Sequence, residues 1–147
     1  MKIQQILQKC LTDWKNISQL DFCLIDSENN VFVSTCDKKL PTQKKLDEFR
    51  QSNALCVSNT SCCLYKLTEI RTDSYLLIVW GKGEAASTIG ELAVCQIHSL
   101  FTAYAEKNDK NTFMQNLLLG TYSEMDAFNR AKKLHIATSV RRAVFLV

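Results

Sequence analysis

The residues best suited to bind a small molecule lie in the middle of the sequence. Three cationic side chains there accompany a run of hydroxyl and amide groups and one phenol: Arg50, Ser58, Asn59, Thr60, Ser61, Tyr65, Lys66 and Arg71. A carboxylate or a sugar acid needs a guanidinium or ammonium group together with such donors. The alternative is that the cations are solvated surface charges and that residues 58–61 form a turn. Which interpretation applies depends on the elements that position these residues.

The cysteines and histidines are the other residues with reactive side chains. The seven cysteines are Cys10, Cys23, Cys36, Cys56, Cys62, Cys63 and Cys95. Their number is odd and several lie within apolar runs, which favours reduced thiols that act as small hydrophobic side chains. The alternative is a metal or redox site built from the last four cysteines and His98. The paired C-x2-4-C spacing of zinc sites is absent, and adjacent Cys62 and Cys63 would point to opposite faces of a strand.

No arrangement typical of an enzyme accompanies these residues. His98 lies in an apolar helical stretch, where a lone histidine is usually packed, and the other histidine is His135. The sequence contains no G-x-S-x-G motif and no Ser/His/Asp or Cys/His spacing that favours a nucleophile. Asp21 and Asp26 are five residues apart on one predicted strand and would point to opposite faces. The sequence therefore predicts neither catalysis nor a metal or cofactor.

The composition places the chain among globular domains. It has 147 residues, of which 46% are hydrophobic and 22% charged, and this balance excludes disordered and low-complexity classes. No apolar run approaches the roughly 20 residues of a membrane span, and the N-terminus lacks the uninterrupted apolar region of a signal peptide. The net charge of +3 is too small to indicate nucleic-acid binding. We therefore expect a cytoplasmic domain that does not contact the membrane.

Hydrophobic periodicity predicts the elements of the first half. Apolar residues at steps of three and four indicate an amphipathic helix over residues 3–17. Residues 21–26 and 31–34 are short β-favouring runs, and the polar turn at 27–30 makes them a hairpin. Pro41 then opens a short helix with a narrow apolar face.

The second half begins with two more strands. Residues 62–70 and 75–80 favour β-structure, and the second run is apolar throughout, as for a central strand. The longest helical signal follows over residues 84–120, and its polar run at 106–111 either interrupts the helix or is solvated. A helix over 124–134 and a strand over 141–147 complete the chain.

This order of elements predicts an α+β fold of the PAS or GAF type. The antiparallel sheet would be flanked by helices and followed by a long C-terminal signalling helix. In such a fold a small ligand lies between the sheet and the helix and loop after the first hairpin, where the eight binding residues map. We expect residues 1–112 to form this sensor domain, and residues 113–147 to form linker helices and the first strand of a further, truncated domain.

The long helix carries a broad apolar stripe. Its residues include Ile89, Ala93, Ile97, Leu100 and Tyr104. The stripe either only covers the sheet or also pairs with the same helix of a second subunit. We predict a homodimer in which a shift of this helix carries the signal.

The C-terminal stretch carries a three-part motif. The matching residues are Phe113, Leu117, Leu118, Leu119, Gly120 and Tyr122, then Arg130, Ala131, Lys132, Lys133, Leu134 and Ile136, then Arg141, Arg142, Val144, Phe145, Leu146 and Val147. They resemble the linker of bacterial sugar-diacid-regulator (CdaR/PucR-type) transcription factors, which reads F-x-x-x-L-L-L-G-x-Y, R-A-K-K-L-x-I and R-R-x-V-F-L-V. In that family a sensor domain precedes the linker, and a GGDEF-like domain begins at its end.

The resemblance implies an effector-sensing and dimerisation domain of a transcriptional regulator. Its small-molecule effector would be a carboxylate or a sugar acid, and DNA would bind only through a C-terminal helix-turn-helix domain absent from this chain. Two alternatives remain open from the residues: a PAS-type dimerisation scaffold without a ligand, and a cysteine-based metal or redox sensor.

Overall fold

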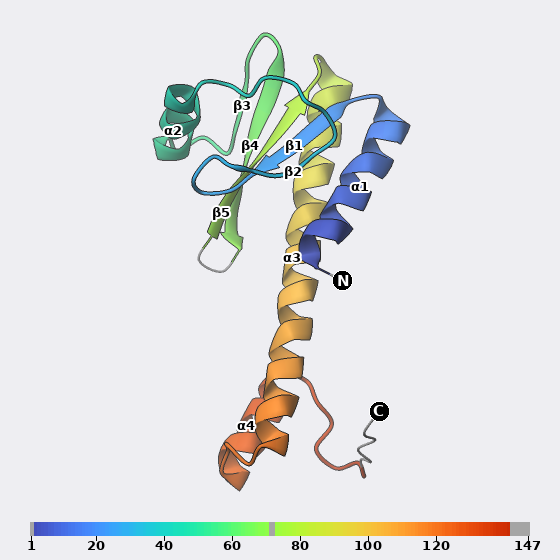
Figure 1. Ribbon diagram of the computed structural model, residues 1–147, viewed down its shortest axis with the longest axis vertical. Helices are drawn as coiled ribbons and strands as arrows, with labels where there is room; N and C mark the ends of the chain where they lie inside the picture. Colours follow the sequence, from blue (N-terminus) through green and yellow to red (C-terminus); the bar gives the residue numbers. More distant parts are fainter. Residues whose placement is uncertain (1, 71–72, 142–147) are drawn as a thin grey trace. The chain divides into compact units, whose positions relative to one another are not determined.

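The computed structural model describes residues 2–70 and 73–141, which divide into two compact units, Met1–Thr102 and Ala103–Val147. The first unit is built on an antiparallel five-stranded sheet with helices on both faces (Figure 1). The predicted α+β class with an antiparallel sheet is therefore confirmed. The division falls within a helix at Thr102, whereas the sequence predicts a boundary after residue 112.

The helices and strands follow the predicted order as far as residue 133, with one added strand. The elements are α1 (Ile3–Ser18), β1 (Asp21–Ile25), β2 (Val31–Ser34), α2 (Gln43–Gln51), β3 (Cys56–Ser58), β4 (Cys62–Ile70), β5 (Asp73–Trp80), α3 (Glu84–Leu118) and α4 (Glu124–Lys133). Sequence analysis missed β3 because it has only three residues, all exposed, and therefore shows no burial pattern. The sheet order is β2-β1-β5-β4-β3, so β5 lies at the centre, as its apolar sequence predicts.

The two faces of the sheet bury different clusters. One face packs against α1 and the first part of α3 through residues such as Leu7, Phe22 and Ile97. The other face packs against α2 through Leu46 and Phe49. Alternate residues of β4 therefore point to opposite helical layers, and Figure 1 shows α2 on one side of the sheet and α1 and α3 on the other.

The start of β1 is fixed to α1 and to the segment after β2 by charge. The Asp21 carboxylate lies 2.7 Å from the Lys15 ammonium and 2.8 Å from the Lys38 ammonium. Hydrogen bonds from Lys15 and then Lys38 lower the pKa of Asp21 below its ordinary value of 3.8. The ionised carboxylate therefore stabilises the folded state.

Acid titration tests this ion cluster. Because the folded pKa of Asp21 is lowered, its contribution to stability is complete above about pH 4 to 5 and is lost as the pH falls through the folded pKa. We expect the urea midpoint of Asp21→Asn to fall less between pH 5 and pH 3 than that of the unmodified chain. The exposed Asp13→Asn serves as the control and should keep the original pH dependence. Equal slopes in all three proteins would show that Asp21 adds no pH-dependent stability.

The second unit is organised around Phe113, a buried residue near the end of α3. Its ring stacks on Tyr122 at 5.7 Å, and the Arg130 guanidinium lies 4.9 Å from the centre of the Tyr122 ring. Gly120 has a φ of +69°, which favours glycine and confirms its predicted role after the helix end. The polar run 106–111 does not interrupt α3. Of the predicted strand over 141–147, Arg141 is not in a strand and the rest lies outside the described residues.

The sequence predicts no membrane-spanning segment. Within residues 2–70 and 73–141, no helix combines the length and apolar character needed to cross a bilayer. The longest helix, α3, interleaves its apolar residues with a polar run at 106–111.

Candidate functional site

The predicted ligand residues do not converge on one point. Tyr65 and Lys66 are neighbours on β4 and therefore face opposite sides of the sheet. Tyr65 belongs to the cluster beneath α1 and α3, whereas the Lys66 ammonium lies 5.0 Å from the centre of the Phe49 ring on the α2 side. Arg71 lies outside the described residues.

Arg50 connects α2 to neighbouring segments of the first unit through hydrogen bonds. Its guanidinium donates to Asn29 Oδ1 at 3.1 Å, to Ser74 Oγ at 3.1 Å and to the carbonyl oxygen of Asp26. Burial lowers the pKa of Arg50, while the nearby Asp26 and Asp47 oppose that shift. Its donors thus join α2 to the β1–β2 turn and to the start of β5, and are already engaged within the protein.

The polar stretch 58–61 forms the turn between β3 and β4. Asn59 Oδ1 accepts hydrogen bonds from the backbone N–H groups of Ser61 and Cys62, both at 2.9 Å. Ser58 Oγ lies 2.8 Å from Cys63 Sγ, and Thr60 is exposed. These contacts support the alternative raised from the sequence, that residues 58–61 form a turn.

Side chains fill the space between α2 and the sheet, where the sequence places the ligand. Leu46 and Phe49 of α2 are 2% and 5% exposed and pack on Ile25, Leu64 and Ile78 of the sheet. A ligand in this layer would have to displace core side chains.

A groove between α3 and the β3–β4 edge brings together two of the predicted residues, Tyr65 and Lys66. We call it the α3 groove. Its volume is about 760 Å³, and it is lined by Leu55, Cys56, Tyr65, Lys66, Leu67, Glu91, Val94, Cys95, His98 and Ser99. Small-molecule sites typically have volumes of about 300 to 1,000 Å³ and combine apolar walls with a few polar groups. The α3 groove meets both conditions.

The polar groups of the α3 groove are contributed by β4 and by one face of α3. The Tyr65 hydroxyl donates to the Ser87 carbonyl oxygen at 3.3 Å, and burial raises the pKa of Tyr65, so the phenol is neutral near pH 7. Lys66 also lines the groove, but its ammonium lies on the α2 side of the sheet, where it donates to the Ser52 carbonyl oxygen. Exposed Glu91 and His98 lie on α3. The groove therefore presents a phenol, an imidazole and a carboxylate beside its apolar walls.

Gly90 allows α3 to lie directly on this part of the sheet. A Cβ atom at Gly90 would lie 2.4 Å from the Tyr65 hydroxyl oxygen and 2.5 Å from the ring carbon that bears it. Those distances are too short for any real contact, so a larger residue would force helix and ring apart. The spacing between α3 and β4 thus depends on this glycine.

None of the ligand-binding residues predicted from the sequence lies on α3, although Cys95 and His98 were considered there as metal or redox ligands. Glu91, Val94, Cys95 and His98 follow helical spacing and therefore share one face of α3. This helical spacing can be seen in the sequence. The apolar stripe of the same helix, however, led to the prediction that a different face of α3 is the functional one.

The cysteines occupy three environments, and the half-buried one holds Cys10 and Cys36. Cys23, Cys62 and Cys63 are buried, as expected for small hydrophobic side chains, and Cys62 and Cys63 lie on opposite faces of the sheet as predicted. Cys56 and Cys95 are exposed on the α3 groove, so core packing does not account for them. Among the described residues, no three His, Cys, Asp or Glu side chains come together as a metal site.

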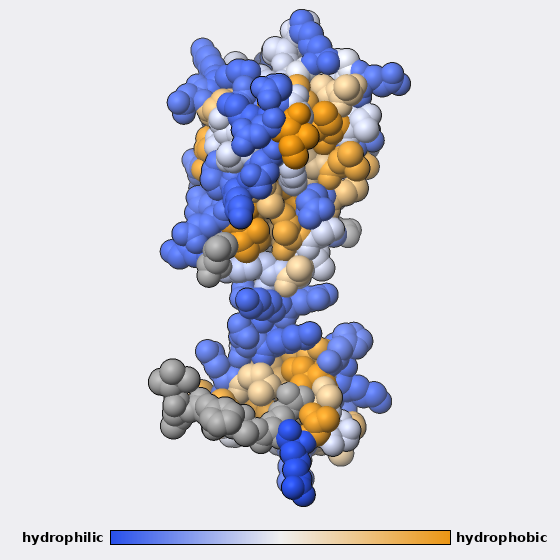
Figure 2. Space-filling model, turned by 90° about the vertical axis from the view of Figure 1, so that its right-hand side faces the viewer, coloured by the Kyte–Doolittle hydropathy of each residue, from blue (hydrophilic) through white to orange (hydrophobic). Residues whose placement is uncertain are grey.

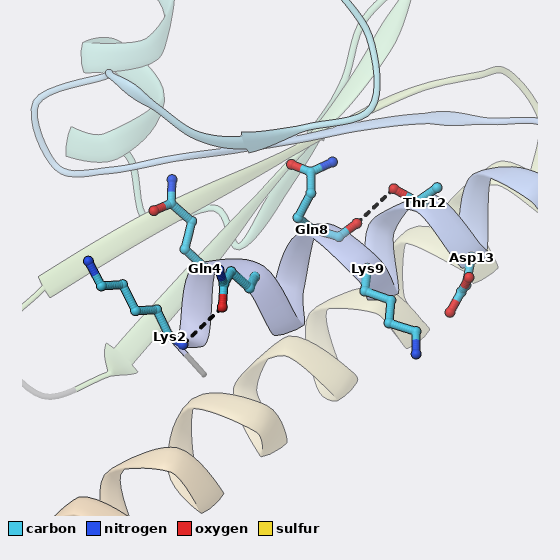
Figure 3. Close-up of a pocket in the computed structure, with 7 residues that line it drawn as sticks. Lys2, Gln4, Gln8, Lys9, Thr12 and Asp13 are labelled. Carbon is cyan, nitrogen blue, oxygen red and sulfur yellow. Dashed lines mark hydrogen bonds between the residues drawn. The ribbon is translucent and has the colours of Figure 1, made fainter.

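A hollow along α1 is a surface feature of one helix. Its lining residues Lys2, Gln4, Gln5, Gln8, Lys9, Thr12 and Asp13 all belong to α1 or its N-cap (Figure 3). The amides of Gln4 and Gln8 donate to the β2 carbonyl oxygens of Phe32 and Ser34, both at 2.8 Å. These side chains therefore cover the outer edge of the sheet.

The predicted pairing stripe faces inward in the first unit. Ala93 and Ile97 are 4% and 0% exposed, and Ile89 and Leu100 pack against the same core. Tyr104 is half-buried and belongs to the second unit. Since Ala93 and Ile97 already contact the sheet, they cannot supply an exposed surface for a second subunit.

Comparison with known proteins assigns no family to this chain. No protein-family model matches the sequence, and neither the curated proteins nor the solved structures contain a match to it. Function is therefore inferred from the α3 groove and from the helix that lines it.

Proposed function

We propose that this chain is the N-terminal sensor module of a cytoplasmic bacterial transcription regulator of the sugar-diacid-regulator type. Its first unit is a PAS-like domain that binds a carboxylate or sugar-acid effector in the α3 groove. Helix α3 then relays the bound state toward the connector that follows. DNA recognition belongs to a helix-turn-helix domain outside this chain.

The sheet supports the PAS-like assignment. Its strand order is β2-β1-β5-β4-β3, all neighbours are antiparallel, and α2 is inserted between β2 and β3. An antiparallel sheet flanked by helices and followed by a long helix is the architecture that the sequence predicts for the PAS or GAF type. The long helix directly after the last strand occupies the position of a signalling helix.

One observation carries the relay proposal: the same helix both lines the groove and continues into the second unit. Helix α3 presents Glu91, Cys95 and His98 to the α3 groove and runs without a break to Leu118. An effector that contacts both β4 and α3 stabilises whichever position of α3 suits it. A helix is rigid enough to transmit such a bias along its length.

The second unit supports the connector assignment. Phe113 and Tyr122 belong to the first part of the linker motif and Arg130 to the second, yet they form one aromatic and cationic stack. The amide of Asn116 donates to the Tyr122 hydroxyl at 3.1 Å and fixes the ring further. This packing gives Phe113, Tyr122 and Arg130 a shared structural role, which supports the proposal that they act together in a connector.

A thermal-shift screen tests effector binding. The panel contains succinate, D-glucarate and allantoin, which represent dicarboxylates, sugar diacids and purine catabolites. A ligand at about 100 times its Kd stabilises the folded state by about 2.7 kcal/mol, so we expect the Tm to rise by about 5–10 °C with at least one compound. His98→Ala should reduce the shift at least threefold. Lys44→Ala, an exposed lysine on α2, should keep it.

The opposite result favours the second candidate function. If no compound raises the Tm, the first unit is a PAS-type dimerisation scaffold without a ligand. The filled layer between α2 and the sheet favours this alternative. A shift that persists in His98→Ala would instead place the effector outside the α3 groove.

A further inference from the structure

Charge is distributed unequally between the two units. Residues 1–102 contain eleven Lys and Arg and eleven Asp and Glu, so the first unit has no net charge. Residues 103–147 contain seven cations and four anions, so the second unit carries the whole net charge of +3. After Asp126 the sequence has five cations and neither Asp nor Glu. Such a charge asymmetry indicates an anionic partner for the basic part of the chain.

The second unit also exposes large hydrophobic side chains. Of the eleven such side chains in the part of the chain that the structure describes, six belong to this unit: Leu117, Leu118, Leu119, Met125, Phe128 and Val140. Figure 2 shows hydrophobic side chains of the second unit in orange, in the lower part of the view, beside hydrophilic ones in blue. Exposed apolar surface with a polar rim marks a contact with a protein or a membrane when it is contiguous.

Apolar and cationic side chains share one surface of this unit. Leu117, Phe128 and Val140 line a groove of about 310 Å³ that has no charged residue among its lining. On α4, Phe128 follows Met125 by three residues and Lys132 follows Phe128 by four, so these three side chains lie on one side of the helix. Met125 is 75% exposed and Phe128 is 51% exposed. We call the surface formed by these five residues the α4 surface.

The cations of α4 are concentrated at its C-terminal end. Arg130, Lys132 and Lys133 lie in the last turn of the helix, and all three are exposed. Glu124 and Asp126 lie in the first turn, where the helix dipole favours anions. The other two anions of the unit lie on α3, together with two further cations. The C-terminal end of α4 is therefore a cationic margin of the α4 surface.

We propose that the α4 surface binds the surface of a bilayer that contains anionic lipids. Met125 and Phe128 enter the boundary between headgroups and acyl chains, while Lys132, Lys133 and the exposed Arg141 contact lipid phosphates. The phosphates of DNA would attract the same cations but would leave both apolar side chains in water, so the pairing of apolar and cationic groups favours lipid. The inference goes beyond the proposed sensor function and does not depend on it. Binding at a bilayer surface requires neither a membrane span nor a signal peptide.

Sedimentation of the full chain with lipid vesicles tests the proposal. On vesicles of equal parts phosphatidylglycerol and phosphatidylcholine at low salt, we expect most of the chain to pellet with the lipid. Vesicles of phosphatidylcholine alone should bind at least about tenfold more weakly, because they lack the negative surface potential. Salt at about 1 M, where the Debye length falls to about 3 Å, should release most of the bound chain from the anionic vesicles.

Exposed substitutions show whether the α4 surface carries the binding. Lys132→Gln should weaken binding about fivefold, the contribution of one cation close to an anionic bilayer. Met125→Gln should weaken it at least about threefold, because its side chain no longer enters the apolar boundary. Lys44→Gln and Ile17→Gln are the matched controls, since these side chains of the first unit are 85% and 83% exposed. Both controls should bind the vesicles as the unmodified chain does.

Several outcomes would overturn the inference. Equal binding to both kinds of vesicle, or unchanged binding in Lys132→Gln and Met125→Gln, would remove the α4 surface as a lipid site. Tighter binding to a DNA duplex than to the vesicles, with no loss in Met125→Gln, would assign the cations to nucleic acid. A mass of two chains in lipid-free light scattering that Met125→Gln reduces to one would assign the surface to a second copy. All these measurements are made without an effector, so their failure and that of the effector screen are distinguishable.

Discussion

Replacing Ile97 by Ala is expected to lower the free energy of unfolding by about 3 kcal/mol, within the 2–5 kcal/mol range for such truncations. Ile97 is fully buried between α3 and the sheet, so the change removes apolar contacts and leaves a cavity. The same truncation at Leu92, which is 65% exposed, should change stability by no more than about 0.5 kcal/mol. The pair separates the inner from the outer surface of one helix.

Urea denaturation at about 1 µM measures both variants without a contribution from dimer formation. If Ile97→Ala unfolds at the same urea concentration as the unmodified chain, α3 is not packed on the sheet as described. If Leu92→Ala proves as destabilising as Ile97→Ala, Leu92 is a core residue and does not lie on the outer surface of α3.

Replacing Arg50 by Ala is expected to cost about 2 kcal/mol, because hydrogen bonds from a charged donor contribute about 1.5 to 3 kcal/mol. The variant removes the donors that join α2 to the Asp26 carbonyl oxygen, to Asn29 and to Ser74. Those acceptors are partly exposed, so water can replace some of the lost bonds. Urea denaturation followed by circular dichroism measures the change.

Lys44→Ala is the control for this prediction, since Lys44 is an exposed cation on the same helix. It should leave the urea midpoint unchanged. The effector screen adds a second readout that a purely structural role would not move. If Arg50→Ala kept full stability but lost the effector-induced rise in Tm, Arg50 would bind the ligand and would not be needed to hold α2 in place.

The order of the elements followed from the sequence because local signals were strong. The polar turn after Asp26 depends on its side chain, which accepts from the N–H groups of Glu28 and Asn30 at 2.9 Å, and such turns are encoded locally. Gly120 could likewise be predicted from the sequence as the residue that follows the end of the helix. Strand β3 was not, because pairing with β4 and not its own sequence creates it.

The candidate site was harder to predict because it depends on contacts between distant segments. Tyr65 and Lys66 were recognised as polar residues on a strand, but alternation sends them to opposite faces, and only Tyr65 reaches the core beneath α3. Arg50 was expected to face a ligand, yet acceptors 21 and 24 residues away engage it. The faces of α3 could be assigned only once its inner residues were seen against the sheet.

Amide chemical shifts of the isotopically labelled chain test the central claim, that an effector in the α3 groove acts on α3 itself. The titrant is whichever of succinate, D-glucarate and allantoin raises the Tm most. We expect the largest shift changes at Tyr65, Val94, Cys95 and His98, with smaller changes continuing along α3 toward Leu118. Changes centred on Leu46 and Phe49 beneath α2, or changes that stay away from α3, would contradict it.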